Sequence, residues 1–204
     1  MRRLLTTLLA VLLACAPALA AAEGVWGQLF GQPQEPETIL VKIDVAGYGV
    51  ITAELYPEYA PITVENFVRL VNEGFYDGLT FHRIIEGFMI QGGDQLGNGT
   101  GGSGRNIKGE FSANGWDNPL RHERGVLSMA RAYMPDSASS QFFIMHEDAP
   151  WLDGQYAAFG RVLTGIEVVD AICANTPVTD GNGTVQRENQ PVITSIRVVE
   201  QAAE

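Results

Sequence analysis

Residues 81–94 of the chain read Phe81-His82-Arg83-Ile84-Ile85-Glu86-Gly87-Phe88-Met89-Ile90-Gln91-Gly92-Gly93-Asp94. The stretch consists of two short runs of β-forming residues with a turn between them. Side chains on a strand alternate between its two faces, so Arg83 and Ile85 share one face of the first run. Met89 and Gln91 share one face of the second run for the same reason. We therefore expect one surface that carries a guanidinium, a thioether and an amide, with Phe88 beside them.

Similar short runs occur on both sides of this stretch, and the chain has 23 glycines to supply the turns between them. The predicted strands cover residues 38–45, 50–56, 80–85, 88–91, 126–130, 141–145, 157–163 and 192–199. Helices are predicted from Pro61 to Gly74 and from Ile166 to Ala174, because apolar residues there recur at helical spacing. Many short strands with only two helices predict a mainly β fold, a closed eight-stranded antiparallel barrel with the two α-helices over its ends.

Two later blocks complete the chemical pattern. The second block runs from Gly125 to Ala130 and continues with Ser140-Gln141-Phe142-Phe143-Ile144. The third block is Trp151-Leu152-Asp153-Gly154, followed by Phe159-Gly160. Together with residues 81–94, these blocks suggest a shallow apolar surface with one cation and one amide. Such a surface suits an uncharged, partly apolar ligand that carries a carbonyl. No nucleophile–base pair is evident in the sequence, so the pattern does not favour hydrolysis.

With all three blocks in this order and spacing, the sequence resembles the cyclophilin family of peptidyl-prolyl cis-trans isomerases from about Thr38 to Glu200. The resemblance implies a cyclophilin-like domain over residues 38–200 that isomerises X-Pro bonds in proline-containing polypeptides without a cofactor or a metal. It implies catalytic roles for Arg83, Gln91 and Phe88. It also implies that the substrate-binding residues are Met89, Ala130, Arg131, Gln141, Phe143, Trp151, Leu152 and Tyr156.

Arg83 suits this chemistry on physical grounds. Amide resonance gives the peptide bond a rotation barrier of roughly 18–20 kcal/mol. Twisting an X-Pro bond localises a lone pair on the proline nitrogen, and a donor aimed at that nitrogen stabilises the twisted state more than the planar one. An arginine stays charged at any relevant pH and carries five N–H groups. No covalent intermediate is required.

Three positions depart from the family pattern: Glu86 replaces a common Pro before Gly87, and two others, Tyr156 and Arg131, belong to the predicted site. Tyr156 stands where many members have His; it keeps an aromatic wall with a polar tip, so we expect activity to survive and cyclosporin-type inhibitors to bind only weakly. Arg131 stands where Asn is frequent, and we expect it to add a cation beside the groove, where Ala130 and Arg131 would contact the substrate through backbone groups.

The N-terminal residues predict export. Residues 1–20 read as a signal peptide, with Arg2-Arg3, an apolar run too short to span a bilayer, and Ala18-Leu19-Ala20 before the cleavage site. Residues 21–37 read as a flexible linker. The alternative is a lipoprotein, because Leu12-Leu13-Ala14-Cys15 resembles a bacterial lipobox that would anchor the chain through Cys15. We expect a periplasmic, secreted or cell-surface protein with no membrane span.

Several other classes find no support. The chain has 13 Lys and Arg against 24 Asp and Glu, a formal net charge of −11, which is poorly suited to nucleic acid. The three histidines are scattered, so no metal site is expected. Cys173 lies in an apolar run and is expected to be buried and inert. We expect a monomer. The alternatives to an isomerase are a non-catalytic peptide-binding module on the same fold and a hydrolase that uses an unrecognised nucleophile.

Overall fold

The computed structural model describes residues 38–199, which form eight strands, two α-helices and three single-turn 3-10 helices. The strands are β1 (Ile39–Val45), β2 (Gly49–Leu55), β3 (Phe81–Ile85), β4 (Met89–Gly92), β5 (Val126–Met129), β6 (Phe142–Met145), β7 (Ala158–Thr164) and β8 (Ile193–Val199). The helices are α2 (Pro61–Asn72) and α3 (Ile166–Asn175), with 3-10 turns η1 (Ser112–Asn114), η2 (Pro150–Leu152) and η3 (Arg187–Asn189). Every strand and helix predicted from the sequence is confirmed, with small shifts at the ends. The predicted signal peptide, the linker, Cys15 and Glu200 lie outside the described residues.

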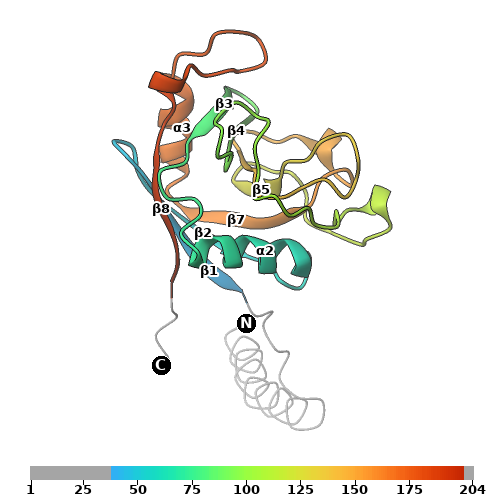
Figure 1. Cartoon of the computed structure of the whole chain (residues 1–204). Coiled ribbons are helices and arrows are strands. Elements are labelled where there is room, and N and C mark those ends of the chain that lie inside the picture. Colours follow the sequence, from blue (N-terminus) through green and yellow to red (C-terminus); the bar gives the residue numbers. More distant parts are fainter. Residues whose placement is uncertain (1–37, 200–204) are drawn as a thin grey trace, which may run out of the picture. The chain divides into compact units, whose positions relative to one another are not determined.

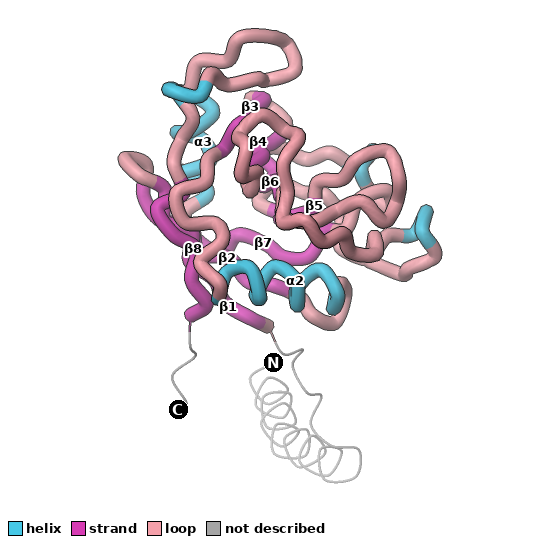
Figure 2. The backbone as a smooth tube through the Cα atoms, viewed as in Figure 1, coloured by secondary structure: helices cyan, strands magenta, loops and turns pink. Residues whose placement is uncertain are grey.

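The strands form one antiparallel sheet in the order β3-β4-β6-β5-β7-β2-β1-β8, which curls into a half-barrel (Figures 1 and 2). The predicted full closure is not confirmed, because the end strands β3 and β8 do not pair along their lengths in the described chain. Hydrogen bonds join them only at one end, from Phe81 N–H to the Pro191 carbonyl (3.0 Å) and from Ile193 N–H to the Leu79 carbonyl (2.8 Å).

The outer edge of β3 is instead covered by residues 183–185. Ile84 N–H donates to the Gly183 carbonyl at 2.8 Å, and Val185 N–H donates to the His82 carbonyl at 3.1 Å. Gly183 has a φ of +79°, and a Cβ atom there would lie 2.2 Å from the Ile84 carbonyl oxygen. Only glycine allows this loop to approach the strand so closely. The loop therefore occupies the edge that β8 would need for closure.

Alternation along the strands separates two apolar clusters on opposite faces of the sheet. Side chains on the inner face form the main core, which includes Ile90, Leu127, Phe142, Ile144 and Phe159. Side chains on the outer face form a smaller cluster, which includes Met89, Val126, Phe143, Leu152 and Ala158. The smaller cluster supports the surface that the sequence singled out.

The helices cover the sheet at separate places (Figure 1). Helix α2 packs against β8, and α3 contacts β2, β3 and β4. The buried Glu110 carboxylate accepts hydrogen bonds from the N–H groups of Ile62 and Thr63 at 2.9 and 2.8 Å, so it satisfies free donors of the first turn of α2. Cys173 is buried on α3, as predicted. Within residues 38–199, neither helix is long and apolar enough to cross a membrane.

Candidate active site

Four side chains form a row across neighbouring strands on the outer face of the sheet. The register pairs Arg83 on β3 with Gln91 on β4, and Gln91 with Phe143 on β6. Phe143 in turn pairs with Ser128 on β5. Directly opposed residues on paired strands have adjacent side chains. The row therefore places a guanidinium, an amide and a phenyl ring side by side, although they are up to sixty residues apart in the chain.

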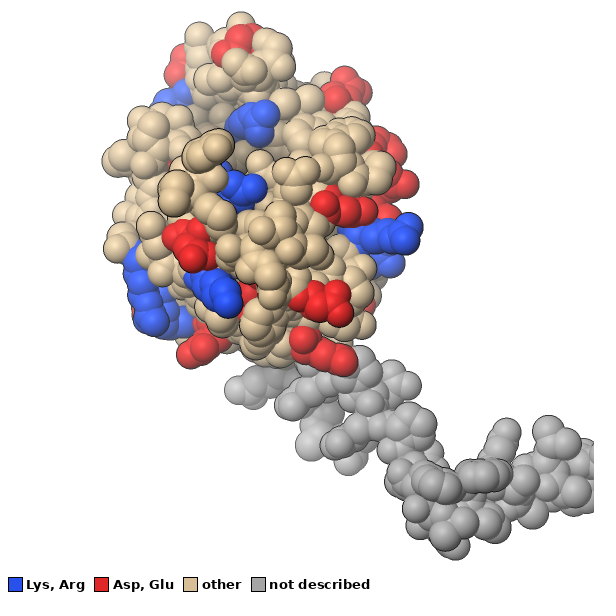
Figure 3. All heavy atoms as spheres, turned by 90° about the vertical axis from the view of Figure 1, so that its right-hand side faces the viewer, with Lys and Arg blue, Asp and Glu red and all other residues tan. Residues whose placement is uncertain are grey.

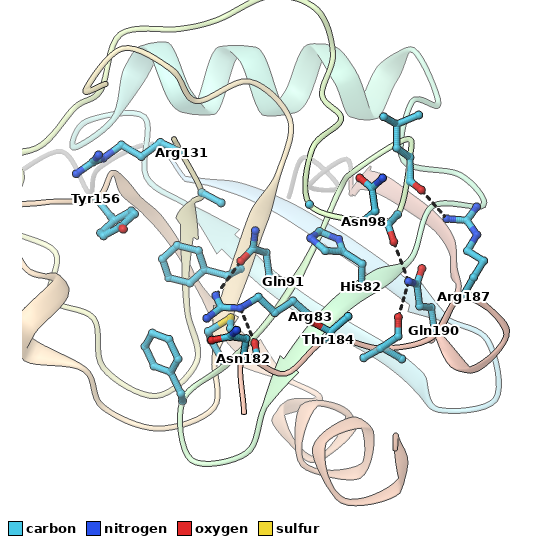
Figure 4. A pocket seen from close by; sticks show the side chains of 18 of the residues that line it. His82, Arg83, Gln91, Asn98, Arg131, Tyr156, Asn182, Thr184, Arg187 and Gln190 are labelled. Carbon is cyan, nitrogen blue, oxygen red and sulfur yellow. Dashed lines mark hydrogen bonds between the residues drawn. The ribbon is translucent and has the colours of Figure 1, made fainter. Parts of the chain in front are cut away.

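Two hydrogen bonds hold the Arg83 guanidinium in a fixed orientation (Figure 4). Its Nε donates to the Asn182 carbonyl at 2.8 Å, and Nη1 donates to Gln91 Oε1 at 3.2 Å. Partial burial lowers the pKa of Arg83 from its ordinary value, against the opposing effects of Tyr156 and Asp180. An arginine starts from so high a pKa that the group stays protonated. Arg83 is thus a permanently charged, oriented donor.

Gln91 is itself fixed by a relay of amides. Its Nε2 donates to Gln141 Oε1 at 2.8 Å. Gln141 Nε2 then donates to the carbonyls of Gly101 (2.8 Å) and Gly99 (3.1 Å). The relay links the Arg83 side chain to a glycine-rich loop on the far side of β4. Both the oxygen and the nitrogen of the Gln91 amide therefore have hydrogen-bond partners, so the amide is held with its oxygen toward Arg83.

An apolar pocket lies beside the guanidinium. The rings of Phe143 and Tyr156 meet edge to face, with centroids 5.9 Å apart and planes at 82°. Phe88 lies next to Trp151, with centroids 5.9 Å apart. The Trp151 side chain is 61% exposed and forms the rim. Phe88, Phe143 and Tyr156 line a cavity of about 820 Å³ that also includes Arg83 (Figure 4). The cavity can hold a small apolar ring against a charged donor.

Comparisons with known proteins identify the family. The family model described as cyclophilin type peptidyl-prolyl cis-trans isomerase matches residues 40–199, most of the chain. The chain belongs to the cyclophilin family of peptidyl-prolyl cis-trans isomerases. It is 56% identical over 117 residues to peptidyl-prolyl cis-trans isomerase B of Bacillus subtilis, which covers 57% of this chain and 78% of the relative. It is 48% identical over 126 residues to an isomerase of Helicobacter pylori, which covers 61% of this chain and 74% of the relative.

A solved structure agrees. A cyclophilin-type isomerase of Cryptosporidium parvum, crystallised in the presence of the dipeptide Ala-Pro, matches with a TM-score of 0.69 and 34% sequence identity. The match covers 79% of this chain and 99% of that one. The cyclophilin fold and the isomerase class expected from the sequence are thus confirmed.

Most of the residues that the sequence predicted for the site surround one cavity of this cyclophilin. They are Arg83, Phe88, Met89, Gln91, Ala130, Arg131, Phe143, Leu152 and Tyr156. Gln141 lines an adjoining hollow of about 410 Å³ together with Gln91 and Ala130. Trp151 lies at the rim rather than in the wall. Their roles in catalysis and binding stay predictions.

Arg131 lines the cavity, and its guanidinium has protein partners of its own. The guanidinium is tied to backbone carbonyls, at 3.0 and 3.1 Å from the Gln155 oxygen and at 2.9 Å from the Ala132 oxygen. It lies over the Tyr156 ring, 4.7 Å from the centroid. Hydrogen bonds to backbone carbonyls and a cation–π contact thus replace solvent around the guanidinium, and Arg131 helps to hold the Tyr156 ring in place. The Ala130 N–H donates to the Gln141 carbonyl at 2.9 Å, so this group is not free for a substrate.

A serine–histidine–aspartate chain lies behind the pocket and was missed in the sequence. The Asp153 carboxylate accepts a hydrogen bond from His122 Nδ1 at 3.0 Å. In this tautomer His122 Nε2 carries no hydrogen, so it accepts a hydrogen bond from the Ser128 hydroxyl, whose Oγ lies 3.0 Å away. Burial lowers the pKa of His122, against the opposing effect of Asp153. Ser128 is 0% exposed and His122 1%, so no substrate reaches them. His122 stacks on Phe143 at 6.0 Å, so the chain supports the pocket floor.

The same cavity has a second group of walls that the sequence did not single out. They are His82, Leu96, Gly97, Asn98, Gly99, Asn182, Thr184, Val185, Arg187 and Gln190. Apart from His82, these residues lie on two loops that are distant in sequence, and no local pattern connects them. On the face drawn in Figure 3, basic side chains occur in separate groups interspersed with acidic ones. No cluster of three or more metal-ligating side chains occurs within residues 38–199.

Proposed function

We propose that the chain is an exported peptidyl-prolyl cis-trans isomerase that accelerates X-Pro rotation in folding proteins, with Arg83 as donor to the proline nitrogen. One observation carries the proposal. Asn182 and Gln91 fix the Arg83 guanidinium beside the apolar walls that Phe88, Met89, Phe143 and Leu152 contribute to the cavity. The remaining N–H groups of the guanidinium are the donors that the reaction requires.

The substrate's proline ring would lie in the pocket formed by Phe88, Met89, Phe143 and Leu152. The bond order of the X-Pro amide falls as the bond twists, and the lone pair returns to the proline nitrogen. The hydrogen bond from Arg83 to that nitrogen becomes stronger as the lone pair develops, so it stabilises the twisted state selectively. No proton is transferred, because the guanidinium keeps its charge throughout.

The catalytic role that the family resemblance implies for Gln91 could take two forms, a hydrogen bond that holds Arg83 or one to the substrate backbone. Its Oε1 accepts from Arg83 and its Nε2 donates to Gln141. These contacts support the first form. The second would require Gln91 Nε2 to exchange its bond to Gln141 for one to the substrate. We therefore propose Gln91 chiefly as the residue that orients the catalytic guanidinium.

Export remains part of the proposal on the basis of residues 1–20. Prolyl isomerisation takes tens to hundreds of seconds and limits folding, so an isomerase in the periplasm, at the cell surface or outside the cell assists exported chains. Mass spectrometry of the mature protein tests this: cleavage after Ala20 leaves Ala21 as the first residue. A lipidated Cys15 would establish the alternative lipoprotein, and an intact Met1 would contradict export. We propose a monomer with weak affinity for cyclosporin-type inhibitors.

A protease-coupled assay on a short X-Pro peptide tests the enzymatic part. Wild type should accelerate the cis-to-trans step, and Arg83→Ala should lose about a hundredfold or more of kcat/KM, the loss typical of one preorganised transition-state donor. Arg121→Ala is the matched control, because Arg121 is an exposed arginine outside the cavity. Equal acceleration by wild type and Arg83→Ala would refute the proposed role of Arg83.

A further inference from the structure

The cavity that holds the proposed proline site continues past Arg83 into a second lobe (Figure 4). One wall of the lobe is the loop around Asn98, and the opposite wall is the segment from Asn182 to Gln190. Gln190 ties the two walls together, because its Nε2 donates to the carbonyls of Gly97 (2.8 Å) and Val185 (2.9 Å). Hydrogen bonds within the protein therefore hold the two walls of the lobe in place.

His82 forms the floor of this lobe. It lies on β3 next to Arg83, on the opposite face of the strand, and is only 4% exposed. Neither ring nitrogen has a hydrogen-bond partner among the described residues. A Cβ atom at Gly99, in the wall, would lie 3.8 Å from His82 Nε2, so this nitrogen faces the loop. A buried ring nitrogen without a partner costs free energy, so it marks a place where a polar group can bind.

The residues that line the cavity are basic, although the chain as a whole is acidic. The chain has a net charge of −11, yet none of the cavity-lining residues is acidic, and they include three arginines, Arg83, Arg131 and Arg187. Asp94 and Asp180 lie close by, but their carboxylates accept backbone N–H groups of the loops. Burial alone would raise the pKa of Asp94, and these bonds hold it below its ordinary value.

Asn98, Arg187 and His82 can each offer N–H groups to the lobe. Asn98 Oδ1 accepts two hydrogen bonds from Thr100, so the Asn98 amide N–H₂ is the end left for a ligand. Among residues 38–199, the one hydrogen bond of the Arg187 guanidinium is a 3.5 Å contact with the Leu96 carbonyl. A neutral imidazole at His82 adds one more N–H. Three donors with one full positive charge suit an anionic oxygen group.

We infer that the second lobe is a subsite for a side-chain carboxylate of the client, an Asp or Glu close to the isomerised proline. The inference rests on the proposed function, because it places the proline against Arg83 in the adjoining lobe. The acidic side chain would pass to the other side of Arg83 and meet Asn98, Arg187 and His82. The isomerase would then favour acidic proline-containing segments.

The test compares peptides that differ only in one charge. Each peptide contains one X-Pro bond. Glu, or its isostere Gln, is placed at one position at a time, at either of the two residues before or the two residues after the X-Pro pair. The readout is the ratio of kcat/KM for the Glu peptide to that for the Gln peptide. We expect a ratio of about fivefold at one position in low salt, as one partly screened charge pair contributes about 1 kcal/mol. High salt should lower it.

Variants then locate the effect. Arg187→Gln and Asn98→Asp should bring the ratio close to one, whereas the exposed Arg121→Gln, which removes the same charge outside the cavity, should leave it unchanged. A ratio near one at every position in wild type would overturn the subsite, as would a preference that survives in Arg187→Gln. Turnover of the Gln peptide reports the isomerase activity separately, so the two proposals can fail independently.

A binding measurement compares the Glu and Gln peptides without turnover. In ¹⁵N NMR spectra, the Glu peptide should shift the His82 ring nitrogens, and the Gln peptide should shift them less. Equal shifts with both peptides, or none with either, would contradict the subsite even if isomerisation is observed.

Discussion

Arg83 and Gln91 are directly opposed on β3 and β4, and Arg83 Nη1 donates to Gln91 Oε1 at 3.2 Å. Gln91 should therefore act by orienting the guanidinium. We predict that Gln91→Ala lowers kcat/KM about tenfold, the loss expected for one hydrogen bond to a charged group. The protease-coupled assay measures this, with the exposed Gln186→Ala as control. An unchanged rate in Gln91→Ala would show that Asn182 alone fixes Arg83.

Phe142 and Phe143 are adjacent in sequence but point to opposite faces of β6, into the main core and into the site cluster. Phe142→Leu and Phe143→Leu should each lower the free energy of unfolding by about 1 to 3 kcal/mol. Only Phe143→Leu should also raise KM for X-Pro peptides under conditions where both variants are folded. Denaturant unfolding and steady-state kinetics separate the two effects. A similar rise in KM for Phe142→Leu would contradict the division into two faces.

Two buried histidines should make stability depend on pH. Burial lowers the pKa of His82 and of His122 below the ordinary value of 6.5. The unfolded chain then binds more protons than the folded one as the pH falls below about 6.5, so the free energy of unfolding should decrease from there toward acid. Urea unfolding at a series of pH values from 8 to 5 measures this slope.

His122→Gln tests the histidine part of that slope. The variant should be less stable than wild type at pH 8, because Ser128 and Asp153 lose a partner, but its stability should fall less between pH 7 and 5. Stability that rises toward acid in wild type, or an identical slope in the variant, would contradict the assignment.

Cys173 should be unreactive in the folded protein. Burial, with smaller contributions from Glu86 and Asp170, raises the pKa of its thiol to about 12. The thiolate is the reactive form, so little is present at pH 8. We predict that iodoacetamide does not alkylate Cys173 without denaturant and does so readily in urea, as followed by peptide mass spectrometry. Rapid alkylation of the native protein would show that α3 opens easily.

The sequence predicts the strands and the faces of their side chains, because alternation with period two is a local property. The prediction that Arg83 and Gln91 share one surface is therefore confirmed. The open edge could not be predicted in this way. It depends on a loop at Gly183 that pairs with β3 across a hundred residues, and pairing at that distance leaves no periodic signal.

Side-chain partners were harder to predict than strand faces. The Arg131 guanidinium stacks on Tyr156 because two segments that are separate in sequence fold against each other. His122 meets Ser128 and Asp153 for a similar reason, since all three lie on different segments. The second lobe beyond Arg83 is built from two loops whose residues have no shared pattern. In each case the contact follows from tertiary packing.

In the proposed mechanism, Arg83 stabilises the twisted X-Pro bond rather than the bound ground state. NMR exchange measurements on an X-Pro peptide give its Kd and the cis–trans interconversion rate on the enzyme separately. We predict that Arg83→Lys and Arg83→Ala lower the interconversion rate on the enzyme about a hundredfold or more, with Kd changing far less. An unchanged interconversion rate with a weakened Kd would contradict the account, because Arg83 would then only bind the substrate.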